Sequence, residues 1–267
     1  MINALQKRYE GYLNTPCLWQ QDSVFNLLQF EISSQTQKID IAVDDNLRLG
    51  KYVERLVSFE LEQQKDISVL AENIQIQRDK LTLGELDCLL LKDNKPIHLE
   101  IIYKFYLYDK SVGTYEIERF IGPNRKDSLV EKLDKLKDKQ LPLLYNNDCK
   151  PFLEKLELKA ETISQQVYFK AQLFLPFTDK NIKLKTLNNN CVVGFYINKN
   201  ELHQFSHCKF YLPNKIDWLI IPHSNVDWLT FESFNTIAQK YFEQKYSSLI
   251  WVKLKTGLIK KVFLVWW

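Results

Sequence analysis

The sequence has few glycines, no long apolar run and no paired cysteines. Only seven of its 267 residues are glycine and 45% are apolar, which is typical of a packed globular protein rather than a fibrous or disordered one. No run of 18 apolar residues occurs, so no transmembrane helix is predicted. The five cysteines are scattered, their number is odd and none forms a Cys-x-x-Cys pair. Neither a disulfide framework nor a structural zinc site is therefore expected, and a reducing cytoplasm is the predicted location.

The sequence also lacks a strong excess of either charge. Lysine and arginine number 36 against 33 for aspartate and glutamate, a formal net charge of +3. This value is too small to indicate nucleic-acid binding from bulk charge, so any basic surface would have to be local. The first ten residues contain no apolar core of the kind that a signal peptide needs.

The N-terminal third is predicted to be helical. Residues 2–13 and 19–31 have helical character and are separated by Asn14-Thr15-Pro16, where the proline favours an interruption. A third helix is expected over residues 45–63, with Asp44 or Asp45 as its cap.

The middle of the chain is predicted to form three strands and a helix. Residues 67–77, 81–91 and 97–108 have strand character and are joined by short polar turns, which indicates an antiparallel meander. A turn at Gly122-Pro123-Asn124 follows, and then an amphipathic helix over residues 127–141 that Pro142 should stop.

The remainder is predicted to be rich in β-structure. A soft boundary is expected within residues 145–160, and a single helix is predicted over residues 231–245. Two of the short strands expected here would form a hairpin through His223-Ser224-Asn225. The apolar C-terminal end should be tucked into the fold. The expected strands are residues 167–177, 191–197, 209–212, 218–222, 228–231, 248–255 and 260–267.

Acids and amides recur on one face of each middle strand. Side chains alternate between faces with a period of two, so Glu85 shares a face with Asp87, and Glu100 shares one with His98 and Lys104. Asn73 and Gln75 share a face of the first strand and are candidates to line a groove and contact a substrate. Burying an acid in so apolar a strand is costly unless something compensates it, and two carboxylates on neighbouring strands can hold a divalent ion. The register that would bring these faces together is assumed here, because sequence does not specify it.

These residues also have plainer interpretations. Asp87 and Glu100 could be structural acids that form ion pairs with Lys104 or Arg55. His98 could be a polar residue whose hydrogen bonds are satisfied by its neighbours rather than a base near Glu100. Glu54 lies at the edge of the apolar face of its helix, where an acid is usually solvated but could also serve as an outer ligand.

Several stretches of the middle of the chain form a recognisable set of motifs. They are Leu49–Leu56 (LGKYVERL), Leu70–Gln75 (LAENIQ), Thr82–Asp87 (TLGELD), His98–Glu100 (HLE), Lys104–Leu107 (KFYL), Gly122–Asp127 (GPNRKD), and then Leu129, Lys132, Leu133, Gln140, Leu141 and Pro142. These stretches resemble a bacterial domain-of-unknown-function family, the one numbered 1853; the likeness is close over residues 47–142 and thin in the C-terminal part. The first half of that family is similar to the PD-(D/E)XK nuclease superfamily, in which strand acids bind Mg²⁺ and activate water.

The resemblance implies a role for each matching residue. Asp87 and Glu100 would be the ligands of Mg²⁺, with Mn²⁺ as the alternative, and Glu54 would be the acid of the preceding helix. Lys104 would be the lysine that aids the attacking water. Lys132 and Gln140 match the family pattern, which makes them candidates to contact phosphate.

Two departures weaken the match to the superfamily. Leu86 stands where a proline usually precedes the first acid, and Ile102 stands where the lysine usually follows the second. Lys104 lies two residues further on, about 13 Å from Glu100 along an extended strand at about 3.3 Å per residue. Its long side chain would have to reach back, or a β-bulge would have to shorten the gap.

Together these observations predict an α/β protein with a PD-(D/E)XK nuclease-like core (helix, mixed sheet, helix) and a β-rich C-terminal region. The predicted parts are an N-terminal helical segment at residues 1–40, the core at residues 41–148 and the β-rich region at residues 149–267, which could pack with the core as one domain. The predicted function is metal-dependent hydrolysis of phosphodiester bonds in DNA or RNA. The alternatives are an inactive module of the same fold that binds nucleic acid or a protein, and an interaction protein whose acids are only structural.

Overall fold

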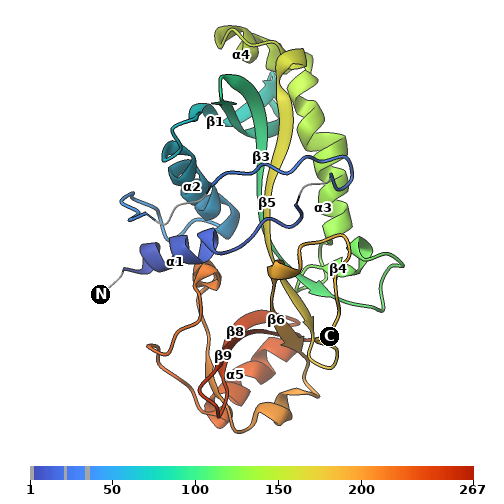
Figure 1. Ribbon diagram of the computed structural model, residues 1–267. Coiled ribbons are helices and arrows are strands. Elements are labelled where there is room, and N and C mark those ends of the chain that lie inside the picture. The colour runs from blue at the N-terminus through green and yellow to red at the C-terminus, as the bar shows by residue number, and fades with distance from the viewer. Residues whose placement is uncertain (1–2, 21–22, 34–36) are drawn as a thin grey trace. The chain divides into compact units, whose positions relative to one another are not determined.

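The chain has a mixed α/β fold, as predicted (Figure 1). The computed structural model describes residues 3–20, 23–33 and 37–267. Within them the α-helices are α1 (Ala4–Leu13), α2 (Leu49–Glu62), α3 (Leu129–Lys135), α4 (Lys150–Lys155) and α5 (Phe231–Glu243). The strands are β1 (Ile67–Arg78), β2 (Leu81–Lys92), β3 (Lys95–Tyr108), β4 (Phe120–Ile121), β5 (Ser164–Pro176), β6 (Val192–Ile197), β7 (Lys209–Tyr211), β8 (Ser248–Lys253) and β9 (Ile259–Leu264).

The chain packs as two units that are discontinuous in sequence. Strands β3 and β5 each contribute residues to both units. None of the helices in the described part of the chain has the length and apolar character needed to cross a membrane. Unit 1 comprises Met1–Pro16, Lys104–Val130 and Ala171–Trp267, and unit 2 comprises Cys17–Tyr103 and Glu131–Lys170.

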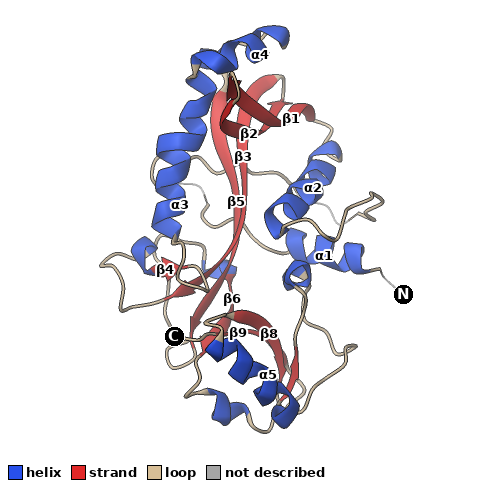
Figure 2. Ribbon diagram, turned by 180° about the vertical axis from the view of Figure 1, so that it is seen from behind, coloured by secondary structure: helices blue, strands red, loops and turns tan. Residues whose placement is uncertain are grey.

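Unit 2 contains the predicted antiparallel meander. Strands β1, β2 and β3 pair in sequence order, with Ile74 opposite Leu86 and Leu89 opposite His98. Helices α2 and α3 lie on opposite sides of β3 and β5 (Figures 1 and 2). The apolar stripe of α2, at helical spacing, is fully buried (Val53, Leu56, Val57 and Leu61). A second apolar cluster joins β1 and β2 to the segment after α3, and it includes Ile74, Ile76, Leu86, Leu89, Leu143, Leu144 and Leu153.

Unit 1 contains a mixed sheet covered by α5. Strand β5 pairs in parallel with β6 and β6 with β9, whereas β9, β8 and β7 pair antiparallel. The rings of Phe210 and Phe234 stack with their centroids 4.2 Å apart, which attaches α5 to β7. Val265 is fully buried, and the Trp267 indole N–H donates to the Pro123 carbonyl at 3.0 Å. The prediction that the C-terminal end is tucked into the fold is confirmed.

The helix predicted over residues 19–31 is wrong. Residues 19–20 and 23–31 contain no helix; residues 21–22 lie outside the described part of the chain. The Phe30 N–H donates to the Val167 carbonyl at 2.8 Å, and the Val167 N–H donates to the Leu28 carbonyl at 2.9 Å. The segment therefore runs beside β5 as a strand-like edge, burying Phe30 while Leu28 stays exposed. Pairing with a distant strand has overridden the local helical pattern.

The hairpin predicted through residues 223–225 is also wrong. Residues Lys215–Leu219 form a 3₁₀-helix rather than a strand, and residues 228–231 contribute only a bridge between Leu229 and Phe210. A side-chain contact holds this 3₁₀-helix in place, because its Asp217 forms an ion pair with Arg8 of α1 at 2.7 Å.

Two predicted helices have different bounds in the structure. Helix α2 begins at Leu49 rather than Asp45, because the Asp44 carboxylate accepts the Asn46 N–H in a local turn instead of capping the helix. Helix α3 begins at Leu129 and continues as a π-helical turn over Leu136–Gln140. A 3₁₀-helix over Leu141–Tyr145 follows and includes Pro142, which was expected to stop the helix.

Two helical glycines should respond in opposite ways to alanine. A Cβ on Gly11 of α1 would lie 2.0 Å from the Leu219 carbonyl oxygen, whereas one on the exposed Gly50 of α2 would meet nothing within 4 Å. We expect Gly11→Ala to lower the free energy of unfolding by about 1–3 kcal/mol through this backbone clash. Gly50→Ala should raise it by up to about 1 kcal/mol through helix propensity. Urea denaturation of both variants checks this, and equal effects would contradict the packing of α1 described here.

Candidate functional site

The two predicted metal ligands lie at the end of the ladder between β2 and β3. The hydrogen-bonded register of these strands ends at the Cys88–Leu99 pair, and Asp87 and Glu100 are the next residue on each strand. At this point the Asp87 side chain replaces a ladder bond, because its Oδ2 accepts the Ile101 N–H at 2.9 Å. The other oxygen of Asp87 accepts no hydrogen bond from the described residues.

The surroundings of Asp87 disfavour its charged form. Burial is the main cause, and the negative charges of Glu100 and Glu54 add to it, so that the pKa of Asp87 rises to about 7. The Ile101 N–H and the positive charge of Lys132 act in the opposite direction. This pattern shows that acids from β2, β3 and α2 lie near one another, with Lys132 as the nearby cation.

Glu100 is completely buried, and both of its oxygens are hydrogen-bonded. Oε1 faces His98 Nε2 at 3.2 Å, and Oε2 accepts from Gln140 Nε2. The Gln140 Oε1 in turn accepts from Lys132 Nζ at 2.7 Å. Gln140 therefore links a cation to a buried carboxylate and fixes the orientation of the Glu100 side chain.

The tautomer of His98 follows from its second partner. The Gln165 amide nitrogen lies 2.6 Å from the Leu141 carbonyl oxygen and 3.0 Å from His98 Nδ1. Because only the NH₂ group can donate to Leu141, Gln165 also donates to Nδ1. Nδ1 is then unprotonated, and Nε2 carries the hydrogen that is donated to Glu100. His98 is thus a neutral, buried ring that orients the carboxylate.

The π-helical turn after α3 supplies Gln140. A π-turn adds a residue to a helical turn and changes the direction of the side chains that follow, and such turns are frequent at functional sites. Here Leu136–Gln140 forms the turn, and Leu136 is buried while Gln140 reaches Glu100. The segment thus combines core packing with the support of an acid on β3.

A second polar cluster is centred on Lys51 of α2. Lys51 Nζ donates to Glu54 Oε2 and to Asn73 Oδ1, both at 2.8 Å, and also to Glu85 Oε1. Burial lowers the pKa of Lys51, but the bonds to Glu54 and Glu85 outweigh it, so the pKa lies above its ordinary value. Burial raises the pKa of Glu54, with Lys51 opposing this shift. Lys51 therefore places a positive charge inside the acidic face.

Asn73 adopts an unusual backbone conformation for a strand residue. Its φ is +53°, in the left-handed region, and it lies between the Glu72–Cys88 and Ile74–Leu86 pairs, opposite Asp87. Asparagine tolerates this region better than most residues. The kink accompanies the contact of its side chain with Lys51.

The structure brings most of the predicted residues into these two clusters. Asp87, Glu100, Gln140 and Lys132 belong to the first, and Glu54 and Asn73 to the second. Gln75 pairs with Glu85 across β1 and β2, and its side chain accepts from Gln77.

Lys104 has a different partner. It donates to Asp127 Oδ2 at 2.7 Å within unit 1.

Two residues of these clusters, Lys51 and Gln165, were not predicted. Lys51 could have been found from its i, i+3 spacing to Glu54 on one helix. Gln165 has no such signal, because it is far from His98 in sequence.

The donors at Asp87 and Glu100 suit a hard cation in type. Mg²⁺ is commonly held by one or two carboxylates together with waters and substrate oxygens, and a carboxyl with a raised pKa next to another acid gains most from a cation. A cage of three or more histidine, cysteine, aspartate or glutamate ligands is absent from the described residues. The five cysteines are free thiols.

Comparison with known proteins identifies the family of the chain. A family profile with the description "Domain of unknown function (DUF1853)" matches residues 5–265. The chain belongs to this family. The match extends beyond the stretches noted above and covers both units of the DUF1853 fold. Searches of curated proteins and of solved structures found no match.

The raised pKa of Asp87 predicts how stability depends on pH. The folded state holds this proton more tightly than the unfolded state, so stability is highest below the pKa of the unfolded side chain, near 4, and is lost as pH rises through about 7. Asp87→Asn should therefore be more stable than the parent protein at pH 8 but not at pH 4, as measured by thermal unfolding. Asp138→Asn, at an exposed acid, serves as the control. Parallel pH profiles for the parent and Asp87→Asn would contradict the burial of this charge.

Proposed function

We propose that this DUF1853 protein is a metal-dependent nuclease with a PD-(D/E)XK-like site in unit 2. The observation that supports the proposal most is the pair formed by Asp87 and Glu100, two acids held together on adjoining strands with too little positive charge beside them. The order helix, three antiparallel strands, helix in unit 2 agrees with such a core.

In this proposal Asp87 and Glu100 hold Mg²⁺, or Mn²⁺ in its place. When bound, the ion would offset the charge of the scissile phosphate and lower the pKa of a coordinated water. Asp87 offers the oxygen that is not bonded to Ile101. Glu100 must share an oxygen that already accepts a hydrogen bond, and His98 and Gln140 keep its carboxylate in one orientation. Glu54 adds negative charge at the edge of the site.

The lysine of the site is assigned to Lys132. Its charge acts on Asp87, and it reaches Glu100 through Gln140. Lys104, the lysine expected from the resemblance, forms an ion pair with Asp127 instead. A cation at Lys132 would stabilise the negative charge that develops on the phosphate oxygens during hydrolysis.

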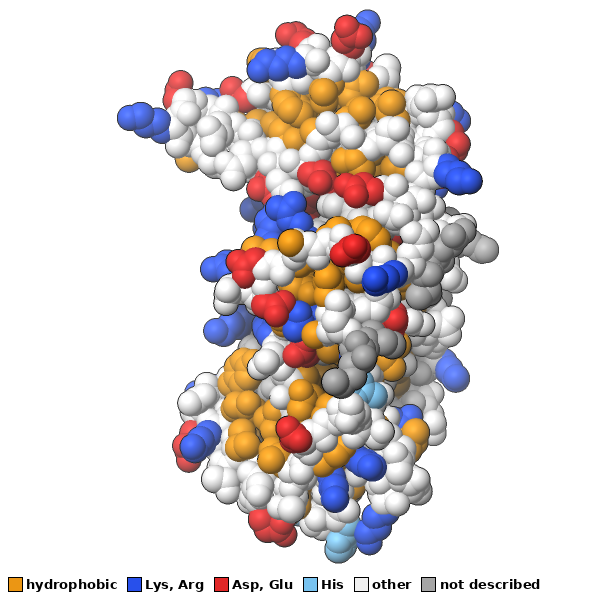
Figure 3. Space-filling model, turned by 90° about the vertical axis from the view of Figure 1, so that its left-hand side faces the viewer, with side chains coloured by type: hydrophobic (Ala, Val, Ile, Leu, Met, Phe, Trp, Pro, Cys, Tyr) orange, Lys and Arg blue, Asp and Glu red, His pale blue; other side chains and the backbone are white. Residues whose placement is uncertain are grey.

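Contacts with the nucleic acid would be local. Lysine and arginine side chains are interspersed with acids on the face shown in Figure 3, without a continuous basic surface. Asn73 and Gln75 of β1 lie across from Asp87 and Glu85 of β2, and they are the proposed substrate contacts beside the metal site.

One observation favours the second candidate function, an inactive module that binds nucleic acid or a protein. The ammonium of Lys51 already contacts Glu54, Glu85 and Asn73. A lysine in this position can offset the negative charge of the acids in a nuclease fold that no longer binds a metal ion. The two functions differ in their need for a divalent ion.

The test combines metal binding with cleavage of single- and double-stranded DNA and RNA. The parent protein should bind Mg²⁺ in a calorimetric titration and cleave at least one of these substrates only when Mg²⁺ or Mn²⁺ is present. Asp87→Asn and Glu100→Gln should each abolish Mg²⁺ binding and cleavage. Gln140→Leu should weaken Mg²⁺ binding by about 10–100-fold, because it releases the orientation of Glu100.

The two lysines separate the assignments. Lys132→Met should lower kcat by about 10²–10³-fold through lost electrostatic stabilisation, whereas Lys104→Met should have little effect. Lys135→Met, on the same helix as Lys132 but exposed, is the matched control. Binding of nucleic acid that is independent of metal and survives Glu100→Gln would support the inactive module. No metal binding and no cleavage in the parent protein would contradict the nuclease proposal.

A further inference from the structure

Unit 1 contains a buried lysine without an acidic partner. Lys261 of β9 is 6% exposed, and its Nζ donates to Gln172 Oε1 at 2.9 Å, to the Trp218 carbonyl at 2.6 Å and to the Leu219 carbonyl at 3.5 Å. All three acceptors are neutral. A buried charge is expensive unless an opposite charge compensates it, and neutral acceptors do so only in part.

No acid of the described residues supplies this countercharge. On the surrounding elements, Asp217 of the 3₁₀-turn is engaged by Arg8 of α1, and Glu10 of α1 accepts from Gln6. The basic residues nearby in the sheet are Lys260 on β9 and Lys253 on β8. None of these groups forms an ion pair with Lys261, and burial alone lowers the pKa of the Lys261 amine to about 7.

Lys261 also lines a cavity. The cavity has a volume of about 320 Å³, at the small end of the range for ligand sites. Two of its lining residues are lysines and none is acidic. One wall is apolar and includes Ile221, which is 50% exposed. The lining consists of Gly11, Asn14, Thr15, Gln172, Val193, Leu219, Ile221, Pro222, Ile259, Lys260 and Lys261.

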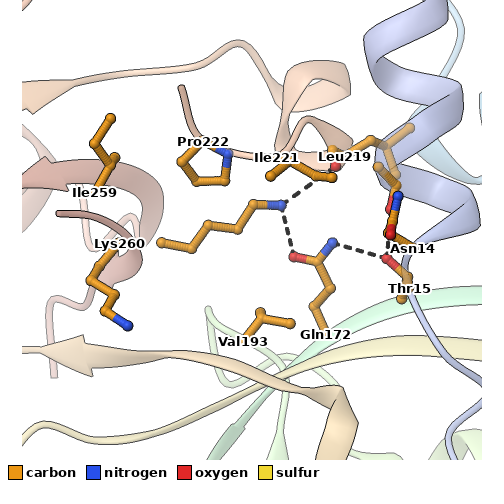
Figure 4. Close-up of a pocket in the computed structure, with 11 residues that line it drawn as sticks. Asn14, Thr15, Gln172, Val193, Leu219, Ile221, Pro222, Ile259 and Lys260 are labelled. Atoms are coloured by element: carbon orange, nitrogen blue, oxygen red, sulfur yellow. Dashed lines mark hydrogen bonds between the residues drawn. The ribbon is translucent and has the colours of Figure 1, made fainter. Parts of the chain in front are cut away.

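The polar side of the cavity is organised by a chain of hydrogen bonds. Figure 4 shows the amide of Gln172 directed toward Thr15, to which it donates at 3.2 Å, while Thr15 Oγ1 donates to the Gly11 carbonyl. The side chain of Lys260 points away from Gln172 in the same view. Gln172 is thereby fixed with its oxygen toward Lys261.

We propose that this cavity binds a small organic monocarboxylate, with its charged group against Lys261 and its apolar part against Val193, Ile221 and Pro222. A single buried cation matches a single negative charge. The long contact with the Leu219 carbonyl is the one that an entering carboxylate oxygen would replace. Covering Ile221 would remove exposed apolar surface from water, which favours binding.

The binding should depend on pH in a defined direction. Only protonated Lys261 offers a positive charge, and this form declines as pH rises through about 7. Since apparent affinity scales with the fraction of protein in the competent form, affinity should fall about tenfold between pH 6 and pH 8.

The test uses calorimetric titration of the full chain with benzoate, and with neutral benzamide as the ligand control. We expect benzoate to bind about tenfold more tightly at pH 6 than at pH 8, and benzamide to bind at neither pH. Lys261→Met should abolish benzoate binding, whereas Lys255→Met, at an exposed lysine outside the cavity lining, should retain it.

A second variant keeps the test decisive if Lys261→Met does not fold. Gln172→Glu would place a carboxylate beside Lys261, and it should raise the melting temperature at pH 7 and abolish benzoate binding. Absence of benzoate binding in the parent protein at both pH values would overturn the proposal. So would benzoate binding that is independent of pH and unaffected by Gln172→Glu.

Discussion

Two carboxyl groups, those of Asp87 and Glu100, are held side by side within an apolar three-stranded meander, and the rest of unit 2 has to balance their charge. Part of the balance comes from fixed dipoles. The Ile101 N–H donates to Asp87, and His98 and Gln140 contact Glu100. Another part comes from Lys132, which acts through Gln140. The negative charge that is left over is neutralised by a proton on Asp87. A divalent ion would replace that proton if the site is a nuclease centre.

The same constraint appears with opposite sign in unit 1. Lys261 is a buried cation whose contacts are an amide oxygen and two backbone carbonyls. In unit 2 the buried charge has a supporting shell of side chains, whereas in unit 1 it borders a cavity. Each site contains a buried ionisable group whose pKa is shifted to about 7, and groups of this kind are candidates for functional sites.

Local sequence patterns predicted the elements whose burial is periodic. Helices α1 and α2, the meander and α5 have regular apolar spacing, and the structure contains them within a few residues of the predicted bounds. The segment at residues 19–31 was predicted wrongly because its partner, Val167, is distant in the chain. Trp218 and Leu219 were misassigned because their carbonyls serve a side chain of β9. Contacts of this kind leave no periodic signal in the sequence.

The candidate site could be predicted to a similar extent. The alternation of side chains along β2 and β3 suggested that Asp87 and Glu100 lie near each other. The pKa of Asp87 agrees with this, because the negative charge of Glu100 contributes to raising it. The connection from Lys132 through Gln140 to Glu100 depends on a π-helical turn, and the support of His98 depends on Gln165, far along the chain. Neither follows from spacing, because the first requires the packing of the segment after α3 against β3 and the second requires β5 to lie beside β3.

The most direct measurement is an NMR titration of the Asp87 side-chain carboxyl from pH 3 to pH 9, without and with Mg²⁺. A midpoint near pH 7 is expected in the metal-free protein, with a decrease of about 1–3 pH units when Mg²⁺ is added. A midpoint near pH 4 that Mg²⁺ leaves unchanged would show that Asp87 is an ordinary solvated acid and would contradict a metal site at Asp87 and Glu100.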